Sequence, residues 1–468
     1  MPRLPLRLTR EAATAELTAA LAALRTELAL PQEFPAEVLA EAGRAVAEHV
    51  LPELDLGEIP FVTIDPAGAT DLDQALAIEA DGAGWQVFYA IADLPSFVVP
   101  GGAIDAEARL RGQTLYAADG RIPLHPPVIS EGAASLLPGE ERAAFVWEFA
   151  LDASGATTSA RVRRARVRSR RQWSYEDAQA ALGSEPMLGL LQRVGEARLA
   201  LESARGGASL ATPEIVVERD AAGYLLERRV LRPIESWNAQ LSLMTGMAAA
   251  RMMLDAGLGI LRTMPPAEPA AIEHFRRQTI ALGTPWPADE RYGDYLRRLA
   301  NDDPRHLAIR HAAGSLFRGA AYRAFDGEPP EETVQSAIGA PYTHVTAPLR
   351  RLVDRFALEV CVALSAGDEV PAWVREALPE LPSLMARSAN ASGRLDRRTL
   401  DTVEAAILAP HVGEEFEAIA ITDATIQLAD PAVEAPCAGP LRPGDEVRVR
   451  LAAADIPSGV VRFEPVSP

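Results

Sequence analysis

The spacing of apolar residues changes several times along the chain, and each change marks a different kind of structure. From Glu11 to about Val50, two stretches rich in Ala and Leu repeat with a helical period and are separated by prolines. After Pro60 the pattern becomes short runs rich in β-branched and aromatic residues between Gly and Pro turns. We therefore expect a helical region followed by a sheet or barrel whose strands carry FVTI, LAIEA, WQVFYAIA, FVWEFALD and RVRRARVRSR.

The second half of the chain repeats this alternation. Residues 175–408 are mostly helical in pattern, as in NAQLSLMTGMAAARMMLDAG and APLRRLVDRFALEVCVALSAG. Residues 411–468 contain five short β-rich runs, which predict a small OB-type barrel. OB barrels often bind single-stranded nucleic acid by stacking bases on aromatic side chains, but this segment offers only Phe416 and Phe463. A supporting role in RNA binding and a purely structural cap are both open for this barrel.

Together these patterns predict an α+β multidomain protein, and 468 residues with 48% hydrophobic residues can bury the cores of two to four domains. We expect an N-terminal helical module at residues 1–55, with a helix-turn-helix as one option. A mixed α/β domain with a central sheet or barrel should occupy residues 56–410, and the OB barrel residues 411–468.

Charge limits the kind of nucleic-acid partner. The net charge of −19 argues against a protein that coats nucleic acid through its overall field, so a polyanion would have to meet a local basic surface. All 46 basic residues are arginines, whose planar guanidinium binds phosphate in a bidentate manner. The lack of lysine excludes a P-loop and a Schiff-base mechanism.

Cysteine content and hydropathy set the expected compartment. Two widely separated cysteines, Cys361 and Cys437, exclude a disulfide framework or a zinc knuckle. No segment reaches the ~18 apolar residues that a membrane span needs, and the N-terminus lacks an apolar signal core. We expect a cytoplasmic protein without membrane contact.

The most informative segment is DPAGATDLDQ, which directly follows the strand-like run FVTI. Asp71 and Asp73 are two residues apart and can point the same way, and Gly68 can fold the loop so that Asp65 approaches them. Three carboxylates this close would repel one another unless a hard cation lay among them, and such a ligand set suits Mg²⁺ and phosphoryl-transfer chemistry. The alternative is a turn rich in Asp that only caps a hairpin.

The turn is the first of several motifs that occur in a defined order over residues 61–412. The motifs read TIDPAGATDLDQA, YAIAD, RGQTLY, RIPLHP and YTHVTAPLRRL, and their order is a far more specific family signature than any one motif alone. The series resembles the catalytic RNB domain of the ribonuclease II family of 3′-to-5′ exoribonucleases. The resemblance implies an RNB-type fold for the middle domain and an S1-type barrel for the last one.

The resemblance also implies metal ligands. Asp65, Asp71 and Asp73 fall on three of the family's four magnesium-binding aspartates, and Gln74 falls on the fourth. A site for one or two Mg²⁺ ions follows, with Asp71 and Asp73 also catalytic. Because a neutral amide replaces a carboxylate at Gln74, the site carries about one negative charge fewer and should hold a pair of ions less tightly. Weaker activity, altered metal preference and loss of turnover are all open.

Two more residues gain roles from the resemblance. Arg350 falls on an arginine implied to contact phosphate beside the metal ions, and a position at a helix N-terminus after Pro348 would strengthen its pull on anions. The alternative is an exposed ion pair with Asp354. Tyr116 falls on an aromatic residue that stacks on a base near the RNA 3′ end. Arg111, in the same motif, is also expected to contact RNA. The alternative for Tyr116 is ordinary core packing.

The arginine-rich run adds a candidate path for RNA. If it is a strand, alternate side chains share one face and could follow a single-stranded backbone. A solvated charged face is an equally good explanation. The residues concerned are Arg164, Arg166, Arg168 and Arg170.

The resemblance implies a Mg²⁺-dependent enzyme that hydrolyses single-stranded RNA from its 3′ end to nucleoside 5′-monophosphates, without a small-molecule cofactor, and we expect a monomer. Family members usually begin with two cold-shock barrels, whereas this chain has helical sequence there, so we expect different RNA loading with some tolerance of structured RNA. The main alternative is a weakly active or non-catalytic RNA-binding protein with a degenerate metal site. A phosphodiesterase of small nucleotides would leave the arginine-rich run unexplained.

Overall fold

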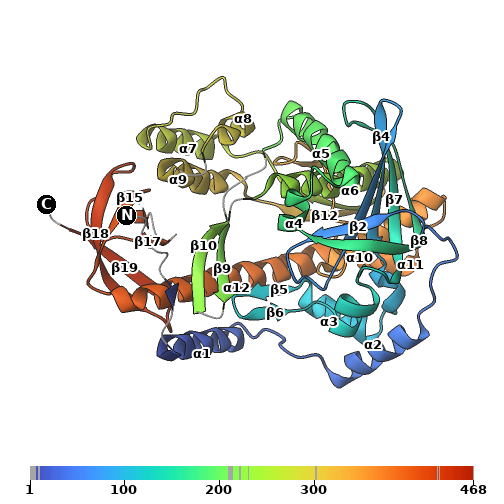
Figure 1. Ribbon diagram of the computed structural model, residues 1–468, viewed down its shortest axis with the longest axis horizontal. Helices are drawn as coiled ribbons and strands as arrows, with labels where there is room; N and C mark the ends of the chain where they lie inside the picture. The colour runs from blue at the N-terminus through green and yellow to red at the C-terminus, as the bar shows by residue number, and fades with distance from the viewer. Residues whose placement is uncertain are drawn as a thin grey trace.

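A closed five-stranded β-barrel forms the centre of the larger part of the molecule (Figure 1). The computed structural model describes residues 7–8, 11–208, 214–220, 223–229, 231–300, 303–428, 431 and 433–466. Neighbouring barrel strands are antiparallel, except that β2 and β8 close the barrel in parallel. All five strands expected from the hydrophobic pattern are present: β2 (Phe61–Asp65), β3 (Gln74–Asp81), β4 (Gly84–Ala92), β7 (Glu141–Leu151) and β8 (Thr157–Ser174).

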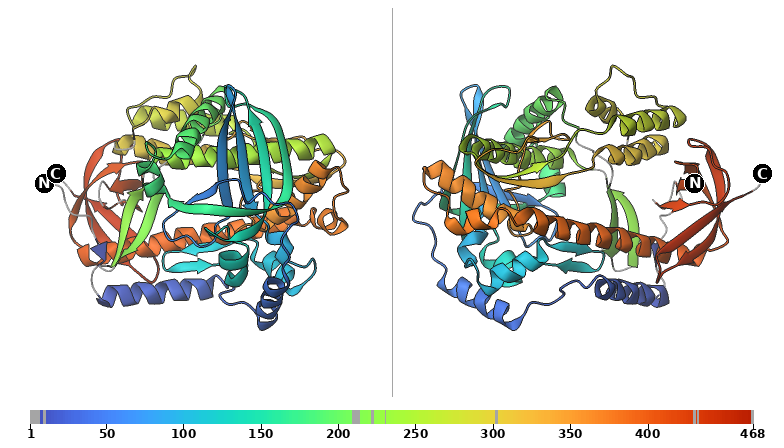
Figure 2. Two further views of the ribbon diagram at one scale, coloured as in Figure 1. Left: turned by 45° about the vertical axis from the view of Figure 1, so that its right-hand side comes forward. Right: turned by 180° about the vertical axis from the view of Figure 1, so that it is seen from behind.

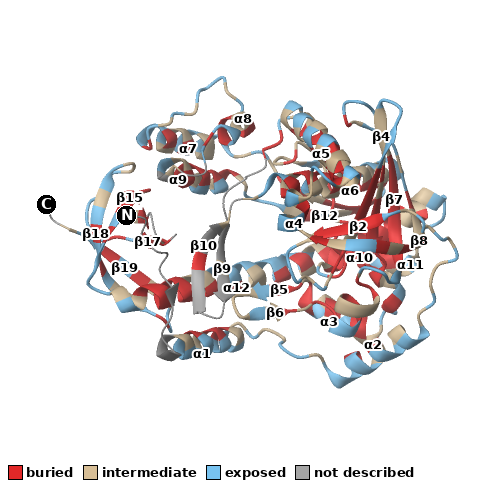
Figure 3. Cartoon of the chain, in the orientation of Figure 1, coloured by how far each residue is buried: buried red, intermediate tan, exposed pale blue. Residues whose placement is uncertain are grey.

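The barrel is filled by large side chains that alternate along its strands. Tyr89, Trp147 and Phe149 are essentially inaccessible to solvent, as expected for strands with one face in a core. Figure 3 shows that buried residues concentrate in these strands and in the adjacent helix α10 (Leu352–Ala366). Leu352, Val353, Phe356 and Val360 of α10 are buried, as is Leu349 in the turn before it.

Helices surround the barrel, and the helical character predicted for residues 175–408 is confirmed. Three strand pairs inside this stretch were not predicted, namely β9 (Glu214–Asp220) with β10 (Gly223–Arg229), β11 (Leu258–Thr263) with β12 (Ala321–Asp326), and β13 (Val334–Gln335) with β14 (Ala340–Pro341). The helices are α4 (Tyr175–Ala180), α5 (Pro186–Ala204), α6 (Pro233–Ala256), α7 (Pro269–Ala281), α8 (Tyr292–Arg297), α9 (Pro304–Ala313), α11 (Ala372–Ala377) and α12 (Leu381–Leu408).

Helix α12 joins the two ends of the molecule. It runs from the central barrel to the C-terminal barrel in both views of Figure 2, and its 28 residues correspond to a length of about 42 Å. Its last turns are buried by the C-terminal barrel, because Val403, Ile407 and Leu408 share a core with that barrel.

The five predicted C-terminal strands are also present and are arranged in the order β17-β16-β15-β18-β19. A bridge between Cys437 and Phe463 brings the end of β17 back to β19, so the sheet nearly closes into a barrel. The OB-type prediction is therefore confirmed. The strands are β15 (Glu415–Ala420), β16 (Thr425–Leu428), β17 (Glu434–Pro436), β18 (Glu446–Asp455) and β19 (Val460–Pro465).

Both N-terminal helices exist, as α1 (Glu11–Glu27) and α2 (Ala36–Glu48), but they do not pack together as a helix-turn-helix. Leu17 and Leu21 of α1 belong to the core of α12 and the C-terminal barrel. Val38 and Ala42 of α2 belong to a core of the central barrel. The apolar faces of the two helices thus pack on different parts of the molecule.

None of the helices that the structure describes is long and apolar enough to cross a membrane.

Smaller elements complete the chain. The remaining elements are β1 (Arg7–Leu8), α3 (Ala103–Arg111), β5 (Leu115–Ala117), β6 (Gly120–Ile122) and the short helical turns Leu94–Phe97, Ile129–Ala133, Gly314–Leu316 and Ala409–His411.

Candidate active site

The acidic turn between β2 and β3 is held in one shape by hydrogen bonds from neighbouring segments. Gly68 has a φ of +77°, a conformation that L-residues other than glycine rarely adopt. The Ser135 hydroxyl accepts from the Leu72 amide at 2.9 Å and donates to the Thr70 carbonyl at 2.7 Å. Gln172 of β8 donates to the Ala69 carbonyl at 2.8 Å. The positions of the carboxylates are therefore fixed by the fold.

Asp73 is the most buried of the three carboxylates, with 4% of the residue exposed. Its Oδ1 accepts from the backbone amide of Leu349 at 2.8 Å, and its Oδ2 lies 3.6 Å from Nε of Arg350. Burial raises the pKa of Asp73 to about 8, although Arg350 and the Leu349 amide oppose this rise. Two segments far apart in sequence thus meet at one carboxylate.

Asp65, the last residue of β2, lies on the same side of the turn. Its Oδ2 is buried and has no hydrogen-bond partner among the described residues. Burial, followed by the charge of Asp71, raises the pKa of Asp65 to about 7, and Arg350 opposes this rise. A buried acceptor without a partner is costly, so this oxygen favours a positively charged neighbour that the protein itself does not supply.

Asp71 is engaged differently, because its carboxylate contacts Arg121. Arg121 Nη1 lies 2.5 Å from Asp71 Oδ1, and Arg121 Nη2 lies 2.8 Å from Glu131 Oε2. The Thr70 hydroxyl accepts from Arg121 Nη2 at 2.9 Å. Arg121 therefore carries the counter-charge of Asp71 in this structure.

Gln74 has both ends of its amide bound by the protein. Its Nε2 donates to the backbone carbonyl of Thr346, and its Oε1 accepts from the Tyr89 hydroxyl at 3.4 Å. The Thr346 hydroxyl is itself 2.8 Å from that of Ser242 in α6. Gln74 thus acts here as a tie between β3 and the Thr346 segment rather than as a free oxygen ligand.

A short backbone pairing places Arg350 and Tyr116 at the same site. The Thr114 amide donates to the Arg350 carbonyl at 3.0 Å, and the Leu352 amide donates to the Gly112 carbonyl at 3.0 Å. The hairpin β5–β6 that follows sets Tyr116 directly opposite Arg121. The Tyr116 residue is 47% exposed and the Arg350 side chain 44% exposed, so both can reach a ligand.

The start of α10 differs from the sequence-based expectation. The helix begins at Leu352, so Pro348 and Arg350 lie in the preceding turn rather than in the first helical turn. Arg351, not Arg350, forms the ion pair with Asp354, at 2.9 Å. Asp354 also accepts from the Ala347 amide at 2.7 Å, which ties the turn to the helix. Arg350 therefore does not pair with Asp354 and lies beside Asp73 instead.

The structure does not support RNA contacts by Arg111. The residue is only 5% exposed, and its guanidinium lies over the ring of Phe34, 3.8 Å from the centroid. It also contacts Glu107 at 2.8 Å and donates to the Pro123 and Glu33 carbonyls. These contacts make Arg111 a structural residue that fixes the end of α3.

The arginines of β8 lie on a strand, but protein partners already bind them. Arg164 contacts Asp93 at 2.9 Å and also Glu359. Arg166 lies 2.6 Å from a carboxylate oxygen of Asp55, and Arg168 lies 2.7 Å from one of Glu141. Arg170 donates to the Gly57 carbonyl. An RNA backbone would have to compete with these contacts, so the RNA path expected along Arg164, Arg166, Arg168 and Arg170 stays a prediction.

The residues present fit a divalent cation in part. Among the described residues no three acidic, His or Cys side chains form a preassembled metal cluster, which agrees with the contact of Asp71 to Arg121. The unpartnered buried Oδ2 of Asp65, together with Asp73 and Asp71, nevertheless forms an oxygen donor set of the kind that Mg²⁺ prefers. Asp65, Asp73 and, once released from Arg121, Asp71 would hold such an ion.

Sequence reasoning missed several residues of this site. Arg121, Tyr89 and Thr346 contact the acidic turn or Gln74. Of these, only Arg121 left a usable signal, because the Asp-Gly turn after Tyr116 is typical of a hairpin that brings residue 121 opposite residue 116.

Comparison with known proteins gives two family matches. The RNB domain pattern matches residues 53–362, and the pattern of the RNase II-type exonuclease C-terminal S1 domain matches residues 414–466. Ribonuclease R of Acidithiobacillus ferrooxidans is 36% identical over 165 residues, which is 34% of this chain and 37% of that protein. The chain spans between 13% and 64% of the length of the curated relatives that it matches.

Solved structures show the same fold at low identity. RNase R of Mycoplasma genitalium in complex with ribose-methylated single-stranded RNA has a TM-score of 0.86 at 18% identity, covering 96% of this chain and 78% of that one. Yeast Ssd1, described as a pseudonuclease, has a TM-score of 0.64 at 15% identity, covering 90% and 53%. At these identities the likeness concerns the fold alone.

Proposed function

The chain belongs to the RNB family, and from that premise we propose that it is a divalent-metal-dependent 3′-to-5′ exoribonuclease. Its substrate would be single-stranded RNA and its product nucleoside 5′-monophosphates. Mg²⁺, as one or two ions, is the proposed metal. The observation that carries the proposal is the meeting of the acidic turn with the Leu349–Arg350 segment at the buried carboxylate of Asp73.

The proposed roles follow from exposure and charge. Divalent ions bound by Asp65, Asp71 and Asp73 would polarise the scissile phosphate and lower the pKa of the attacking water. The water oxygen would form the new bond to phosphorus while the 3′ oxygen of the preceding nucleotide leaves. Arg350, half-exposed and held beside Asp73, would stabilise the charge that develops on the non-bridging oxygens.

Tyr116 and Arg121 would complete the proposed site. The exposed face of Tyr116 can stack on a terminal base without regard to its identity, which suits an enzyme that degrades any sequence. Asp71 would have to exchange Arg121 for a metal ion, and Arg121, opposite Tyr116, would then be free to contact substrate phosphate. The S1-type barrel at the other end of α12 is a proposed additional contact for the RNA strand.

A weakly active or non-catalytic RNA-binding protein is the second candidate. It is favoured by Gln74, whose amide is occupied at both ends and adds no negative charge to the site. The fold itself is compatible with this outcome, because a pseudonuclease is among the structural neighbours.

Asp73→Asn tests the proposed enzyme. The variant should lose at least roughly 100-fold in the rate of RNA hydrolysis, because it removes a buried negative charge that would hold the metal. Asp81→Asn is the matched control, since Asp81 is exposed at the far end of the same strand. Unchanged hydrolysis by Asp73→Asn would refute the assignment.

Gln74→Asp separates the two candidates. A large gain in turnover with unchanged RNA affinity would mean that the natural chain is mainly a binder limited by its metal site. Turnover that stays the same or falls would mean that Gln74 is compatible with catalysis and serves as the tie to Thr346. To distinguish these outcomes, the RNA dissociation constant must be measured together with the rate of RNA hydrolysis.

A further inference from the structure

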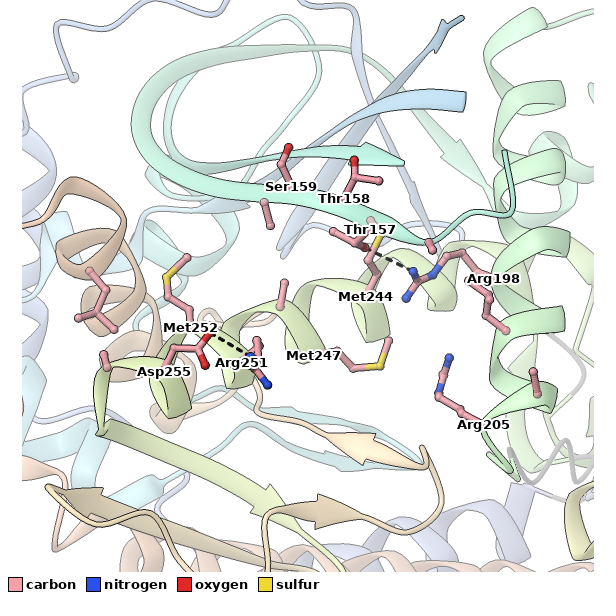
Figure 4. Close-up of a pocket in the computed structure, with 17 residues that line it drawn as sticks. Thr157, Thr158, Ser159, Arg198, Arg205, Met244, Met247, Arg251, Met252 and Asp255 are labelled. Atoms are coloured by element: carbon pink, nitrogen blue, oxygen red, sulfur yellow. Dashed lines mark hydrogen bonds and ion pairs between the residues drawn. The ribbon is translucent and has the colours of Figure 1, made fainter. Parts of the chain in front are cut away.

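A second pocket lies away from the acidic turn, between the start of β8, the end of α5 and the length of α6 (Figure 4). Its volume is about 1070 Å³, which is the size range of pockets that hold drug-sized molecules. None of the residues of the acidic turn lines it. The function proposed above therefore leaves this pocket unexplained.

One wall of the pocket is apolar and adaptable. Met244, Met247 and Met252 from α6 line it, together with Leu201 and Leu364. Methionine side chains are flexible and polarisable, so they can fit apolar or aromatic groups of different shapes.

The opposite part of the pocket holds a buried arginine without a counter-ion. Arg198 is only 5% exposed, and among the described residues no carboxylate forms an ion pair with it or affects its pKa. Its Nη1 donates to the Gly155 carbonyl at 2.9 Å and more weakly to the Thr157 hydroxyl at 3.4 Å, while its buried Nε has no partner. Burial, with a smaller contribution from the nearby charge of Arg205, lowers the pKa of Arg198 to about 10.

Arg205 adds a second unsatisfied guanidinium on the same side of the pocket, as Figure 4 shows. Its Nε donates to the Ile338 carbonyl at 2.7 Å, whereas its Nη2 is buried without a partner. Glu202 is a nearby negative charge that favours the charged form of Arg205, but it compensates at most one of the two cations. The buried guanidinium of Arg198 and the partly buried one of Arg205 lack full compensation, which is costly, so this side of the pocket favours an anion.

The far end of the pocket is electrically balanced and provides a contrast. There Arg251 forms an ion pair with Asp255 at 2.9 Å, and both side chains are largely exposed. Positive charge in excess is therefore confined to the side of Arg198 and Arg205. Thr157 and Ser159 at the start of β8 are exposed and offer hydroxyl groups beside it.

We propose that this pocket binds a small organic anion, with its charged group at Arg198 and Arg205 and its apolar or aromatic body on the three methionines. A nucleotide and a fatty-acyl carboxylate share this chemistry. The site is independent of the acidic turn, so it stands or falls separately from the proposed nuclease activity.

A pair of fluorescent probes tests the charge requirement. 1-Anilinonaphthalene-8-sulfonate and N-phenyl-1-naphthylamine carry nearly the same rings, but only the first has a sulfonate. With the full chain we expect the anionic probe to bind at least roughly 10-fold more tightly, and Arg205→Gln to remove most of that difference. Arg251→Gln is the matched control in the same pocket and should change neither affinity appreciably, because the Arg251 side chain is largely exposed, where water and salt screen its charge.

Further experiments test the apolar part of the pocket and identify the chemical class of the ligand. Met247→Gln should weaken both probes, because it makes the apolar wall polar. Displacement of the anionic probe by adenosine monophosphate would indicate a nucleotide, and displacement by laurate an acyl anion. Equal affinity for the two probes, insensitivity to Arg205→Gln, or no displacement by either anion at millimolar concentration would overturn the proposal.

Discussion

At the scale of single residues, the site is defined by how positive charge is shared among its carboxylates. Arg350 lies beside Asp73, Arg121 neutralises Asp71, and Asp65 keeps a buried oxygen without a partner. A metal ion that uses all three carboxylates must therefore compete with Arg121. This competition makes Arg121 a determinant of metal affinity as well as a neighbour of Tyr116.

Arg121→Gln should raise the affinity for Mn²⁺ or Mg²⁺. The substitution frees Asp71 and removes a positive charge from the site, so we expect the metal dissociation constant to fall by roughly 5-fold or more. Isothermal titration of the RNA-free protein measures this directly. Arg161→Gln is the control, because the Arg161 side chain is largely exposed and its partner is Glu148 rather than a carboxylate of the acidic turn. Unchanged or weaker metal binding in Arg121→Gln would contradict this view of the site.

The sequence could predict which residues are acidic and near one another, but not which partners they choose. Asp65, Asp71 and Asp73 were expected from one short segment, but that they hold a metal ion together stays a prediction, because no such cluster is preassembled among the described residues. The partner of Asp71 is 50 residues away and that of Gln74 is 272 residues away. Such contacts are decided by tertiary packing, which is also why Arg111 is buried rather than available to RNA.

At the scale of elements, α12 both connects the two barrels and carries a buried carboxyl group. Glu404 is only 6% exposed near the C-terminal barrel. Burial, followed by the charges of Asp401 and Glu434, raises the pKa of Glu404 to about 9. At neutral pH this carboxyl is therefore protonated in the folded chain and ionised in the unfolded one.

Glu404→Gln should stabilise the protein, and more so at higher pH. Since the folded pKa is raised, the stability that the protonated group provides is complete below about pH 4.5 and is lost progressively as the pH rises to about 9. Glutamine does not titrate, so the variant should gain up to about 3 kcal/mol in free energy of unfolding at pH 7 relative to the natural chain. Thermal unfolding at pH 5, 7 and 9 measures the trend, and a pH-independent difference would contradict it.

Element prediction succeeded where the hydrophobic period was strong. The strands of both barrels and the long helices follow from periods of two and of 3.6 residues. The pair β11–β12 was missed because its strands are six residues long and separated in sequence by three helices. The sequence placed the start of α10 at Pro348, because proline favours the first turn of a helix. In the structure the residues around Pro348 form a turn instead, held by the hydrogen bond from the Ala347 amide to Asp354 and by the backbone pairing with residues 112–114.

At the scale of the whole molecule, the two barrels and α12 form one connected frame. Helix α1 lies along α12, and Arg398 of α12 pairs with Glu27 at the end of α1.

The fold class and the last barrel could be predicted from sequence, because each stretch has its own period. The packing of α1 and α2 on different parts could not, because both helices show apolar stripes that do not specify a partner. The boundaries at residues 55 and 410 stay predictions.

The central claim is that this frame delivers an RNA 3′ end to Asp65, Asp71, Asp73 and Arg350. The most direct measurement is the time course of products from one single-stranded RNA labelled at its 5′ end and, separately, at its 3′ end, with Mg²⁺ present. We predict that the 3′ label appears at once as a nucleoside 5′-monophosphate while the 5′-labelled strand shortens in single-nucleotide steps, and that Asp65→Asn abolishes both. Internal fragments from either label, or intact RNA in the presence of tight binding, would contradict the account.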